Sequence, residues 1–264
     1  MTKILKKLLA PLMGKVKHQQ LFEKIHLVTL KAMHVGVGES ADKSGEDYVI
    51  NYICKKLENE QDITLFDVGA NIGDYAVLLN TIFKENARIL CFEPSKKTYQ
   101  KLITNTINIP YISHYNVGFG SEETKLQLYS NADESVLASI YNRRLDHFGI
   151  AMNHVEHIDI TTVDKFCIEN SIDKIHFLKL DVEGHELKVL EGAKNMLAGV
   201  DFIQFEFGGC NIDSRTFFQD FFYLLKDKFR IYRVVKNGLY EIKAYREIYE
   251  SFLTTNYLAE RINA

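Results

Sequence analysis

Short apolar runs alternate with helical periodicities along most of this chain. Residues 64–68 and 202–207 are apolar runs, which predict buried strands, whereas residues 217–225 place apolar side chains three or four positions apart, which predicts a helix. The same two patterns recur in order. The predicted strands are residues 64–68, 88–92, 112–117, 175–180 and 202–207, and the predicted helices are residues 46–57, 75–83, 96–106, 163–170, 187–197 and 217–225.

The alternation closes with a predicted hairpin. Residues 229–235 and 239–243 are joined by Asn237-Gly238, a pair typical of a type I′ turn. Strands that alternate with helices and finish in an antiparallel hairpin predict a Rossmann-like α/β fold with a mostly parallel, seven-stranded sheet and helices on both faces. Such sheets bind ligands beyond the carboxyl ends of the strands, where the strand order reverses. Residues 67–74 and 181–186 are therefore expected to meet there.

Three segments differ from the main pattern. Residues 1–35 are predicted to form an N-terminal helical extension, residues 36–245 the main domain and residues 246–264 a C-terminal helical tail. Residues 130–157 are polar and irregular, and are a candidate cover for the substrate. Lysines and leucines at helical spacing in residues 1–17 favour an amphipathic helix packed on the domain or on a partner subunit. Weak contact with a membrane surface is the open alternative, and no apolar run has the length of a membrane span.

Composition and charge narrow the function classes. The chain has 264 residues, 46% hydrophobic and 25% charged, as is ordinary for a globular enzyme. Its net charge of −3 gives no broad field that would favour nucleic acid. Its four cysteines form no Cys-x-x-Cys pair, and Cys91 and Cys167 lie in apolar runs, so reduced core cysteines and a cytoplasmic location are expected. The oligomeric state stays open, with a homo-oligomer as one alternative.

The turn after the first strand has the chemistry of a cofactor site. Asp67 lies near the end of the strand, and Gly69 and Gly73 flank Asn71 before a helix begins. A dinucleotide loop needs a glycine at the position of Asn71, because a side chain there obstructs the approach of a pyrophosphate. Glu93 follows the second strand, where a carboxylate can accept hydrogen bonds from ribose hydroxyls. The pattern favours a nucleoside cofactor without phosphate, and a purely structural turn is the alternative.

Three motifs in this order resemble one known family. They are Asp67-Val68-Gly69-Ala70-Asn71-Ile72-Gly73, Phe92-Glu93-Pro94-Ser95 and Leu178-Lys179-Leu180-Asp181-Val182-Glu183-Gly184-His185-Glu186. They are similar to motifs of the FkbM-type family of S-adenosylmethionine-dependent methyltransferases, over about residues 40–245. The resemblance implies a class I methyltransferase fold, S-adenosylmethionine as cofactor and O-methylation of a sugar or polyketide hydroxyl. By this likeness Gly69, Asn71 and Gly73 line the methionine part of the cofactor and Glu93 binds its ribose, with Asp67 and Asp181 as further cofactor-binding candidates.

The acidic motif after the fourth predicted strand is the candidate catalytic site. Methyl transfer to an alcohol is assisted by a group that removes the hydroxyl proton, and His185 has a suitable ordinary pKa of about 6.5. Asp181 can orient a base, bind the cofactor ammonium or ligate a metal ion. Glu183 and Glu206 add carboxylates that would suit Mg²⁺, although the sequence leaves metal dependence open. The alternative for Glu183 is structural, since negative charge favours a helix N-terminus.

The predicted cover and the motifs that are missing complete the functional hypothesis. Arg143 and Arg144 are candidates to hold an anionic group of the substrate, with solvated surface arginines as the alternative. The chain has no Asn-Pro-Pro-Tyr, Asp-Pro-Pro-Tyr or Pro-Cys motif, so methylation of nucleic-acid bases is unsupported. We expect an O-methyltransferase that acts on a hydroxyl of a glycan or related metabolite. A nicotinamide-dependent oxidoreductase and a non-catalytic binding module are the alternatives.

Overall fold

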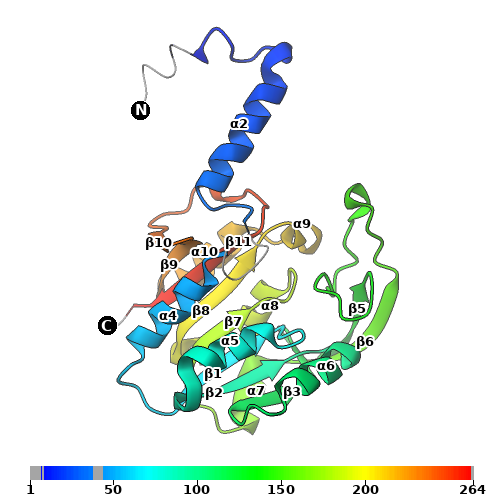
Figure 1. Ribbon diagram of the computed structural model, residues 1–264, viewed down its shortest axis with the longest axis vertical. Helices are drawn as coiled ribbons and strands as arrows, with labels where there is room; N and C mark the ends of the chain where they lie inside the picture. Colours follow the sequence, from blue (N-terminus) through cyan, green and yellow to red (C-terminus); the bar gives the residue numbers. More distant parts are fainter. Residues whose placement is uncertain (1–6, 8, 38–43, 263–264) are drawn as a thin grey trace.

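An eight-stranded sheet forms the centre of the protein (Figure 1). The computed structural model describes residues 7, 9–37 and 44–262. Five neighbouring strands are parallel, and the strands beyond them include antiparallel pairs. In spatial order the strands are β10 (Gly238–Glu241), β9 (Phe229–Val235), β11 (Thr255–Arg261), β8 (Val200–Phe207), β7 (Ile175–Leu180), β1 (Ile63–Val68), β2 (Ala87–Phe92) and β3 (Ile112–Tyr115).

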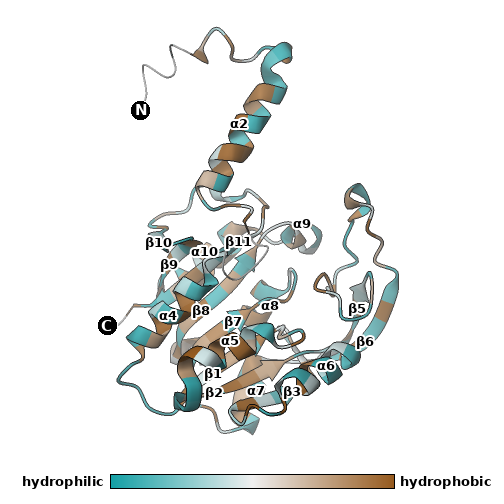
Figure 2. Cartoon of the chain, viewed as in Figure 1, coloured by the Kyte–Doolittle hydropathy of each residue, from teal (hydrophilic) through white to brown (hydrophobic). Residues whose placement is uncertain are grey.

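Helices cover both faces of this sheet, and each face has its own apolar core. One layer consists of α4 (Glu46–Lys56), α5 (Asp74–Phe83) and α6 (Lys96–Thr106), and the other of α7 (Val163–Glu169), α8 (Glu186–Glu191) and α10 (Phe218–Leu225). Figure 2 shows the inner strands as mostly hydrophobic ribbons between helices of mixed colour. The predicted Rossmann-like α/β fold with a mostly parallel sheet and helices on both faces is confirmed.

The strand order reverses at β1, which pairs in parallel with β2 on one side and with β7 on the other. Backbone hydrogen bonds continue past the strand ends. The Asp181 amide donates to the Val68 carbonyl, and the amides of Gly69 and Ala70 donate to the Phe92 carbonyl, each at 3.0 Å. These bonds bring together the loops after β1, β2 and β7, as the sequence predicts for a ligand site at this edge.

The C-terminal segment contains a strand, so the prediction of a helical tail is wrong. β11 lies between β8 and β9 and runs antiparallel to both. Tyr257, Leu258 and Ala259 are all buried, because neighbours and helices cover both faces of the strand. Periodicity alone cannot distinguish such a short continuous apolar run from a buried helix. The extra strand also explains why the sheet has eight strands instead of the predicted seven.

A second, three-stranded sheet stands beside the first. Its order is β4 (Gly118–Phe119), β6 (His154–Thr161) and β5 (Thr124–Ser130). The predicted cover, residues 130–157, forms the connection between β5 and β6 and the first residues of β6. The remaining helical turns are η1 (Val16–His18), η2 (Lys84–Asn86), η3 (Asp146–Phe148), η4 (Met196–Gly199), α9 (Cys210–Ser214) and η5 (Glu247–Tyr249).

The N-terminal helix α2 (Gln19–Ala32) projects away from the domain (Figure 1). Leu30 is the one residue of this helix that is buried. α2 lies within the predicted N-terminal helical extension and is helical as expected. The prediction that an amphipathic helix packs on the domain or on a partner subunit concerns residues 1–17, which precede α2, and it stays a prediction. Residues 1–6 and 8 of the predicted extension lie outside the described residues. Among the helices of the described chain, none is long and apolar enough to cross a membrane.

Candidate functional site

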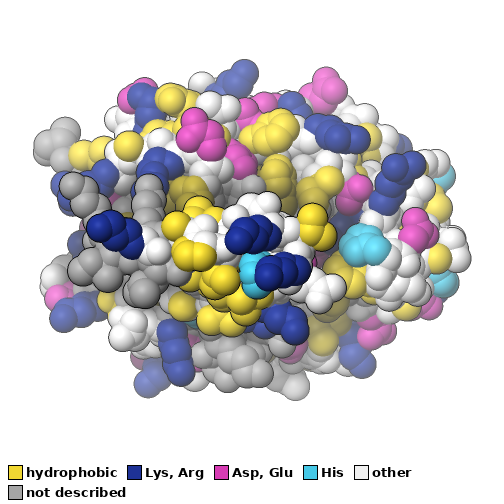
Figure 3. Space-filling model, turned by 90° about the horizontal axis from the view of Figure 1, so that it is seen from above, with side chains coloured by type: hydrophobic (Ala, Val, Ile, Leu, Met, Phe, Trp, Pro, Cys, Tyr) yellow, Lys and Arg dark blue, Asp and Glu magenta, His cyan; other side chains and the backbone are white. Residues whose placement is uncertain are grey.

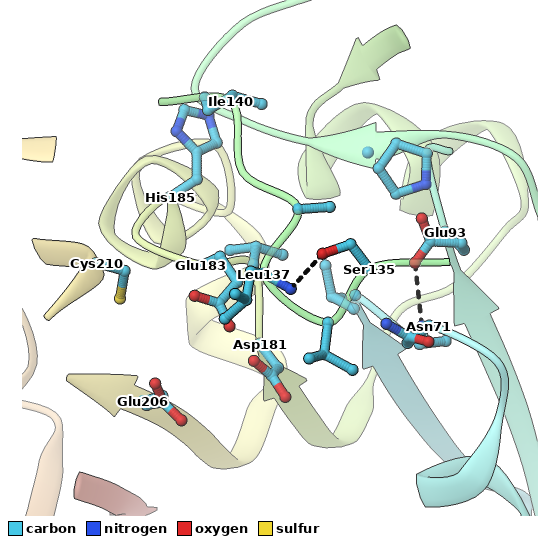
Figure 4. A pocket seen from close by; sticks show the side chains of 18 of the residues that line it. Asn71, Glu93, Ser135, Leu137, Ile140, Asp181, Glu183, His185, Glu206 and Cys210 are labelled. Carbon is cyan, nitrogen blue, oxygen red and sulfur yellow. Dashed lines mark hydrogen bonds between the residues drawn. The ribbon is translucent and has the colours of Figure 1, made fainter. Parts of the chain in front are cut away.

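A cavity of about 890 Å³ lies at the carboxyl edge of the sheet. Its walls come from the turn after β1, the end of β2, the loop after β7, the end of β8 and the connection between β5 and β6. Figure 4 shows Asn71 and Glu93 on one side of the cavity and Asp181, Glu183 and Glu206 on the other. The predicted site residues that line it are Gly69, Asn71, Glu93, Arg143, Asp181, Glu183, His185 and Glu206.

The turn after β1 brings backbone to the cavity wall. Gly69 has a φ of +80°, and a Cβ atom at this position would lie 1.8 Å from the carbonyl oxygen of Asp181. Glycine is required there because the loop after β7 passes so closely. Asn71 has a φ of 47°, and its Oδ1 accepts a hydrogen bond from the Ile72 amide at 2.7 Å. The asparagine side chain therefore stabilises the turn while the backbone lines the cavity.

Glu93 is held in one orientation at the end of β2. Its Oε2 accepts a hydrogen bond from the Asn71 amide at 3.0 Å, and its Oε1 accepts one from the Ser95 amide at 2.9 Å. Burial raises the pKa of Glu93 to about 7, although these two bonds act in the opposite direction. Each carboxylate oxygen retains a lone pair. The side chain can therefore accept hydrogen bonds from two neighbouring ligand hydroxyls, as the ribose of a nucleoside offers.

Four carboxylates surround the other end of the cavity. Asp181 and Glu183 follow β7, Glu206 comes from β8, and Glu46 comes from the first turn of α4. Burial raises the pKa of Glu206, and the charges of Asp181 and Glu183 add to the rise. Glu46 Oε1 accepts a hydrogen bond from the side-chain amide of Gln204 at 2.8 Å. Sequence reasoning missed Glu46 as a site residue, because nothing in the sequence alone places α4 beside the end of β8.

A buried lysine behind these acids was also missed. The Nζ atom of Lys179 lies 3.1 Å from Asp181 Oδ2, 3.5 Å from Asp67 Oδ1 and 4.5 Å from the centre of the Tyr75 ring. Burial disfavours its charge, but Asp181 and Asp67 outweigh this effect and raise the pKa of Lys179. The sequence held a signal. A lysine inside a buried strand needs a partner, and Asp181, the first residue after the strand, lies two positions later and so on the same side of the sheet.

Glu183, in the loop after β7, binds residues of the β5–β6 connection. The Ser139 hydroxyl donates a hydrogen bond to the Glu183 carbonyl at 2.7 Å. The Arg143 guanidinium pairs with the Glu183 carboxylate at 2.5 Å and faces Asp213 at 3.9 Å. Arg143 thus lines the cavity, but its charge is already matched by two acids. Arg144 is exposed and is not part of the cavity wall, so the expectation that both arginines hold an anionic acceptor is not supported.

His185 lies apart from the side chains of Asp181, Glu183 and Glu206 in Figure 4. Its Nδ1 is 3.1 Å from the Tyr141 hydroxyl, and a Cβ atom on Gly120 would lie 3.0 Å from its Nε2. Burial lowers the pKa of His185 to about 4. The ring is therefore uncharged at neutral pH and is a weaker base than an ordinary histidine. Its contacts are those of a residue that holds the β5–β6 connection against the start of α8.

Asp67 and Gly73, which were predicted to bind the cofactor, do not line the cavity. Asp67 is fully buried beside Lys179, and within the described residues neither of its carboxylate oxygens has a hydrogen bond of good geometry. Gly73 faces α6, where a Cβ atom would lie 2.8 Å from the side chains of Leu102 and Thr106. Both residues therefore support the site from behind, as a charge partner of Lys179 and as a close packing contact.

The side chains that line the cavity fit S-adenosylmethionine. This cofactor carries positive charge on its sulfonium and ammonium groups, and the carboxylates at one end of the cavity supply the opposite charge. The other end offers Glu93 for ribose and the apolar side chains of Pro94, Phe119 and Ile158 for a purine. Across residues 7, 9–37 and 44–262, no three His, Cys, Asp or Glu side chains are arranged to hold a metal ion. The Mg²⁺ suggested by the acids stays a hypothesis without an assigned set of ligands.

The chain has relatives among known methyltransferases. The hexuronic acid methyltransferase AglP of Haloferax volcanii is 30% identical over 165 residues, which are 61% of this chain and 62% of that protein. Methyltransferase 1 of Beauveria bassiana is 24% identical over 146 residues, 50% of this chain and 58% of that protein. The matches thus span about three fifths of each relative. An O-methyltransferase of Thermotoga maritima aligns with a TM-score of 0.43 and 12% identity, over 82% of this chain and 66% of that one.

The family comparison covers most of the cavity wall. The methyltransferase FkbM domain matches residues 67–233, a span that includes the glycine turn, Glu93, the acids after β7 and Glu206 on β8. This match favours a methyltransferase with S-adenosylmethionine as its cofactor over the nicotinamide-dependent oxidoreductase that the sequence had left as an alternative. The asparagine at position 71, where a dinucleotide loop needs glycine, agrees with this result. This chain belongs to the FkbM family of S-adenosylmethionine-dependent methyltransferases.

Proposed function

We propose that the protein transfers a methyl group from S-adenosylmethionine to a hydroxyl of a sugar or a related glycan acceptor. The observation that carries this proposal is the acidic end of the cavity. Burial raises the pKa of Glu206 there, and the described neighbouring acids influence this pKa only through their charges. A hydroxyl acceptor needs a group that takes its proton, and such a carboxylate supplies it. AglP, by its name, acts on a hexuronic acid, which supports a sugar as the acceptor.

In this proposal the cofactor, when bound, supplies an electrophilic methyl group, and the residues of this chain bind and orient the reactants. Glu93 and the turn at Gly69 hold the nucleoside end. Asp181 and Glu46 provide negative charge for the ammonium and sulfonium groups. Lys179 holds the Asp181 carboxylate in position, since its ammonium lies 3.1 Å away. The β5–β6 connection covers the acceptor end, which limits water and favours a productive alignment.

We assign proton removal to Glu206 rather than to His185. A general base is most effective when its pKa lies near the working pH. Burial and neighbouring charges raise the pKa of Glu206 from the ordinary carboxylate range, whereas burial lowers that of His185 to about 4. Burial also raises the pKa of Glu183 to about 8, but its carboxylate is already bound by Arg143, and Asp181 is paired with Lys179. Glu206 is thus the carboxylate at this end of the cavity that is best able to accept a proton.

Incubation with methyl-labelled S-adenosylmethionine tests the proposal. Neutral oligosaccharides and hexuronic acids are offered as acceptors, each with EDTA or with added Mg²⁺. We expect a labelled methyl ether, which survives mild alkali. A product that alkali hydrolyses is a methyl ester and would move the reaction to the carboxyl group of a uronic acid. Cofactor binding without label in any sugar would contradict the sugar acceptor, and turnover that EDTA abolishes and Mg²⁺ restores would add a metal ion to the mechanism.

A further inference from the structure

Helix α2 presents an apolar face that the described residues leave open to solvent. Leu21, Ile25 and Val28 are 48%, 43% and 66% exposed. Because an α-helix turns by about 100° per residue, these three side chains lie within about 60° of one another. An apolar face of this kind indicates a surface that meets an apolar environment.

Lysines accompany this face. Residues 9–37 contain four lysines and one glutamate, although the net charge of the whole chain is −3. Lys24 and Lys31 lie on α2 beside the apolar face, and Lys15 and Lys17 precede the helix. Figure 3, which looks down on the α2 end of the molecule, shows apolar side chains with Lys and Arg side chains around them. Positive charge is thus concentrated where the apolar side chains are exposed.

A second copy of the chain is a poor partner for this face. α2 has 14 residues, so it is about 21 Å long and about 10 Å wide, and one face covers only about 200 Å². A stable protein–protein interface buries about 800 Å² on each partner. In a symmetric pair the lysines beside the two faces would also approach one another, with only Glu23 to offset them. Area and charge therefore both favour an anionic surface that has an apolar interior.

The base of α2 is attached beside the cavity. The Gly36 amide donates a hydrogen bond to the Thr254 carbonyl at 3.0 Å, and a Cβ atom on Gly36 would lie 3.4 Å from Leu253. Leu253 and Thr254 both line the cavity. Val136 and Phe148 line it too and are 71% and 69% exposed. In Figure 1, α2 and the β5–β6 connection extend toward the same end of the molecule.

We propose that α2 binds an anionic lipid surface. Its apolar face enters the boundary between headgroups and acyl chains, and the lysine stems extend so that their ammonium groups reach the headgroups. Because the base of α2 lies beside the cavity, docking places the cavity, with Val136 and Phe148 at its wall, near the lipid. No residue of α2 lines the cavity, so this interaction is independent of the methyl-transfer chemistry.

Co-sedimentation of the full chain with vesicles tests this inference. One set of vesicles contains equal parts of phosphatidylcholine and phosphatidylglycerol, and the other contains phosphatidylcholine alone. We expect binding to the anionic vesicles that weakens as salt is added, because added ions screen the lysines. Binding to neither kind of vesicle would overturn the proposal. Equal binding to both would overturn its electrostatic part.

Two adjacent residues give a matched pair of variants. Val28→Asp places an acid on the apolar face, whereas Leu27→Asp places the same acid about 100° away at a position that is 50% exposed. We expect Val28→Asp to weaken vesicle binding about tenfold or more, since one buried valine accounts for such a factor. Leu27→Asp should have a much smaller effect. Equal losses would overturn the role of the apolar face, and a dimer in analytical ultracentrifugation that Val28→Asp alone dissociates would assign the face to a second copy.

Discussion

The two halves of the cavity are built by different kinds of contact. On the cofactor side, backbone amides of Asn71 and Ser95 hold Glu93, and the turn at Gly69 fits directly against the backbone of the loop after β7. On the acceptor side, Glu183 after β7 is held by the side chain of Arg143, and the described neighbours of Glu206 on β8 act on it through their charge. The cofactor half therefore depends on the chain path, and the acceptor half on individual side chains.

This difference separates binding from chemistry. Contacts made by the backbone persist when most side chains change, so the cofactor half suits a reactant that is the same throughout a family. Contacts made by side chains can be exchanged one at a time, which suits acceptors that differ between enzymes. Substitutions in the first half should reduce stability or cofactor affinity, whereas substitutions in the second half should reduce the rate of methyl transfer.

The largest effect is expected for Glu206→Gln on the acceptor side. Removal of a general base lowers the rate by about a thousandfold, within the usual range for such catalysis. Only the ionised carboxylate accepts a proton, and the pKa of Glu206 is raised. The wild-type rate should therefore increase with pH through that raised pKa, and the variant should lose this increase. Measurement of kcat against pH, at saturating cofactor, checks both expectations.

A control acid lies on the same strand. Asp201 is on β8 outside the cavity, where it pairs with Lys174 at 3.0 Å. Asp201→Asn should leave kcat and its pH profile within about twofold of the wild type, because a surface ion pair has little influence on the site. A Glu206→Gln variant with a normal rate would remove Glu206 from the mechanism and the acceptor half from its proposed role.

The next effect concerns the backbone contact of the cofactor half. In Gly69→Ala the new methyl group would lie 1.8 Å from the Asp181 carbonyl, so the turn or the facing loop must move. We expect the free energy of unfolding to fall by about 3 kcal/mol. Gly149→Ala is the control, since Gly149 also has a positive φ of 69° but no atom within 4 Å of a Cβ. It should cost only about 1 kcal/mol, and chemical denaturation of both variants measures the difference.

The same contrast explains what the sequence could predict. The glycine turn and Glu93 were identified because their roles follow from local chain geometry and from strand order. Glu46 was missed because its role appears only when α4 and β8 meet. Lys179 was missed although the sequence held a signal for it, a lysine within a buried strand with Asp181 two positions later. The ion pair between Arg143 and Glu183 and the burial of His185 likewise depend on tertiary contacts. The segment that forms β11 was predicted as helix because a short apolar run fits a buried helix as well as a strand. The contacts of β11 with its two neighbouring strands distinguish these possibilities, and periodicity does not describe such contacts.

A smaller effect is expected for Glu93→Ala on cofactor affinity. The variant loses two acceptor atoms that the Asn71 and Ser95 amides hold in place. Loss of hydrogen bonds to a charged group should weaken binding of S-adenosylhomocysteine about thirtyfold. Glu122→Ala, which removes an exposed acid after β4, is the control and should leave affinity unchanged. Calorimetric titration gives both values, and an unchanged affinity in Glu93→Ala would show that this residue does not bind the cofactor.

The smallest effect is expected for His185→Gln, which tests whether the histidine positions the β5–β6 connection or acts as the base. We expect kcat to fall by less than about threefold, because a ring with a pKa of about 4 contributes little general base catalysis. The depressed pKa also has a consequence for stability. As pH falls from about 6.5 toward 4, the unfolded chain takes up a proton at this site before the folded chain does, so the wild type loses stability. His185→Gln should lose less over the same interval in denaturant titrations at several pH values. A thousandfold lower kcat in this variant, together with a normal rate in Glu206→Gln, would exchange the roles assigned to the two residues.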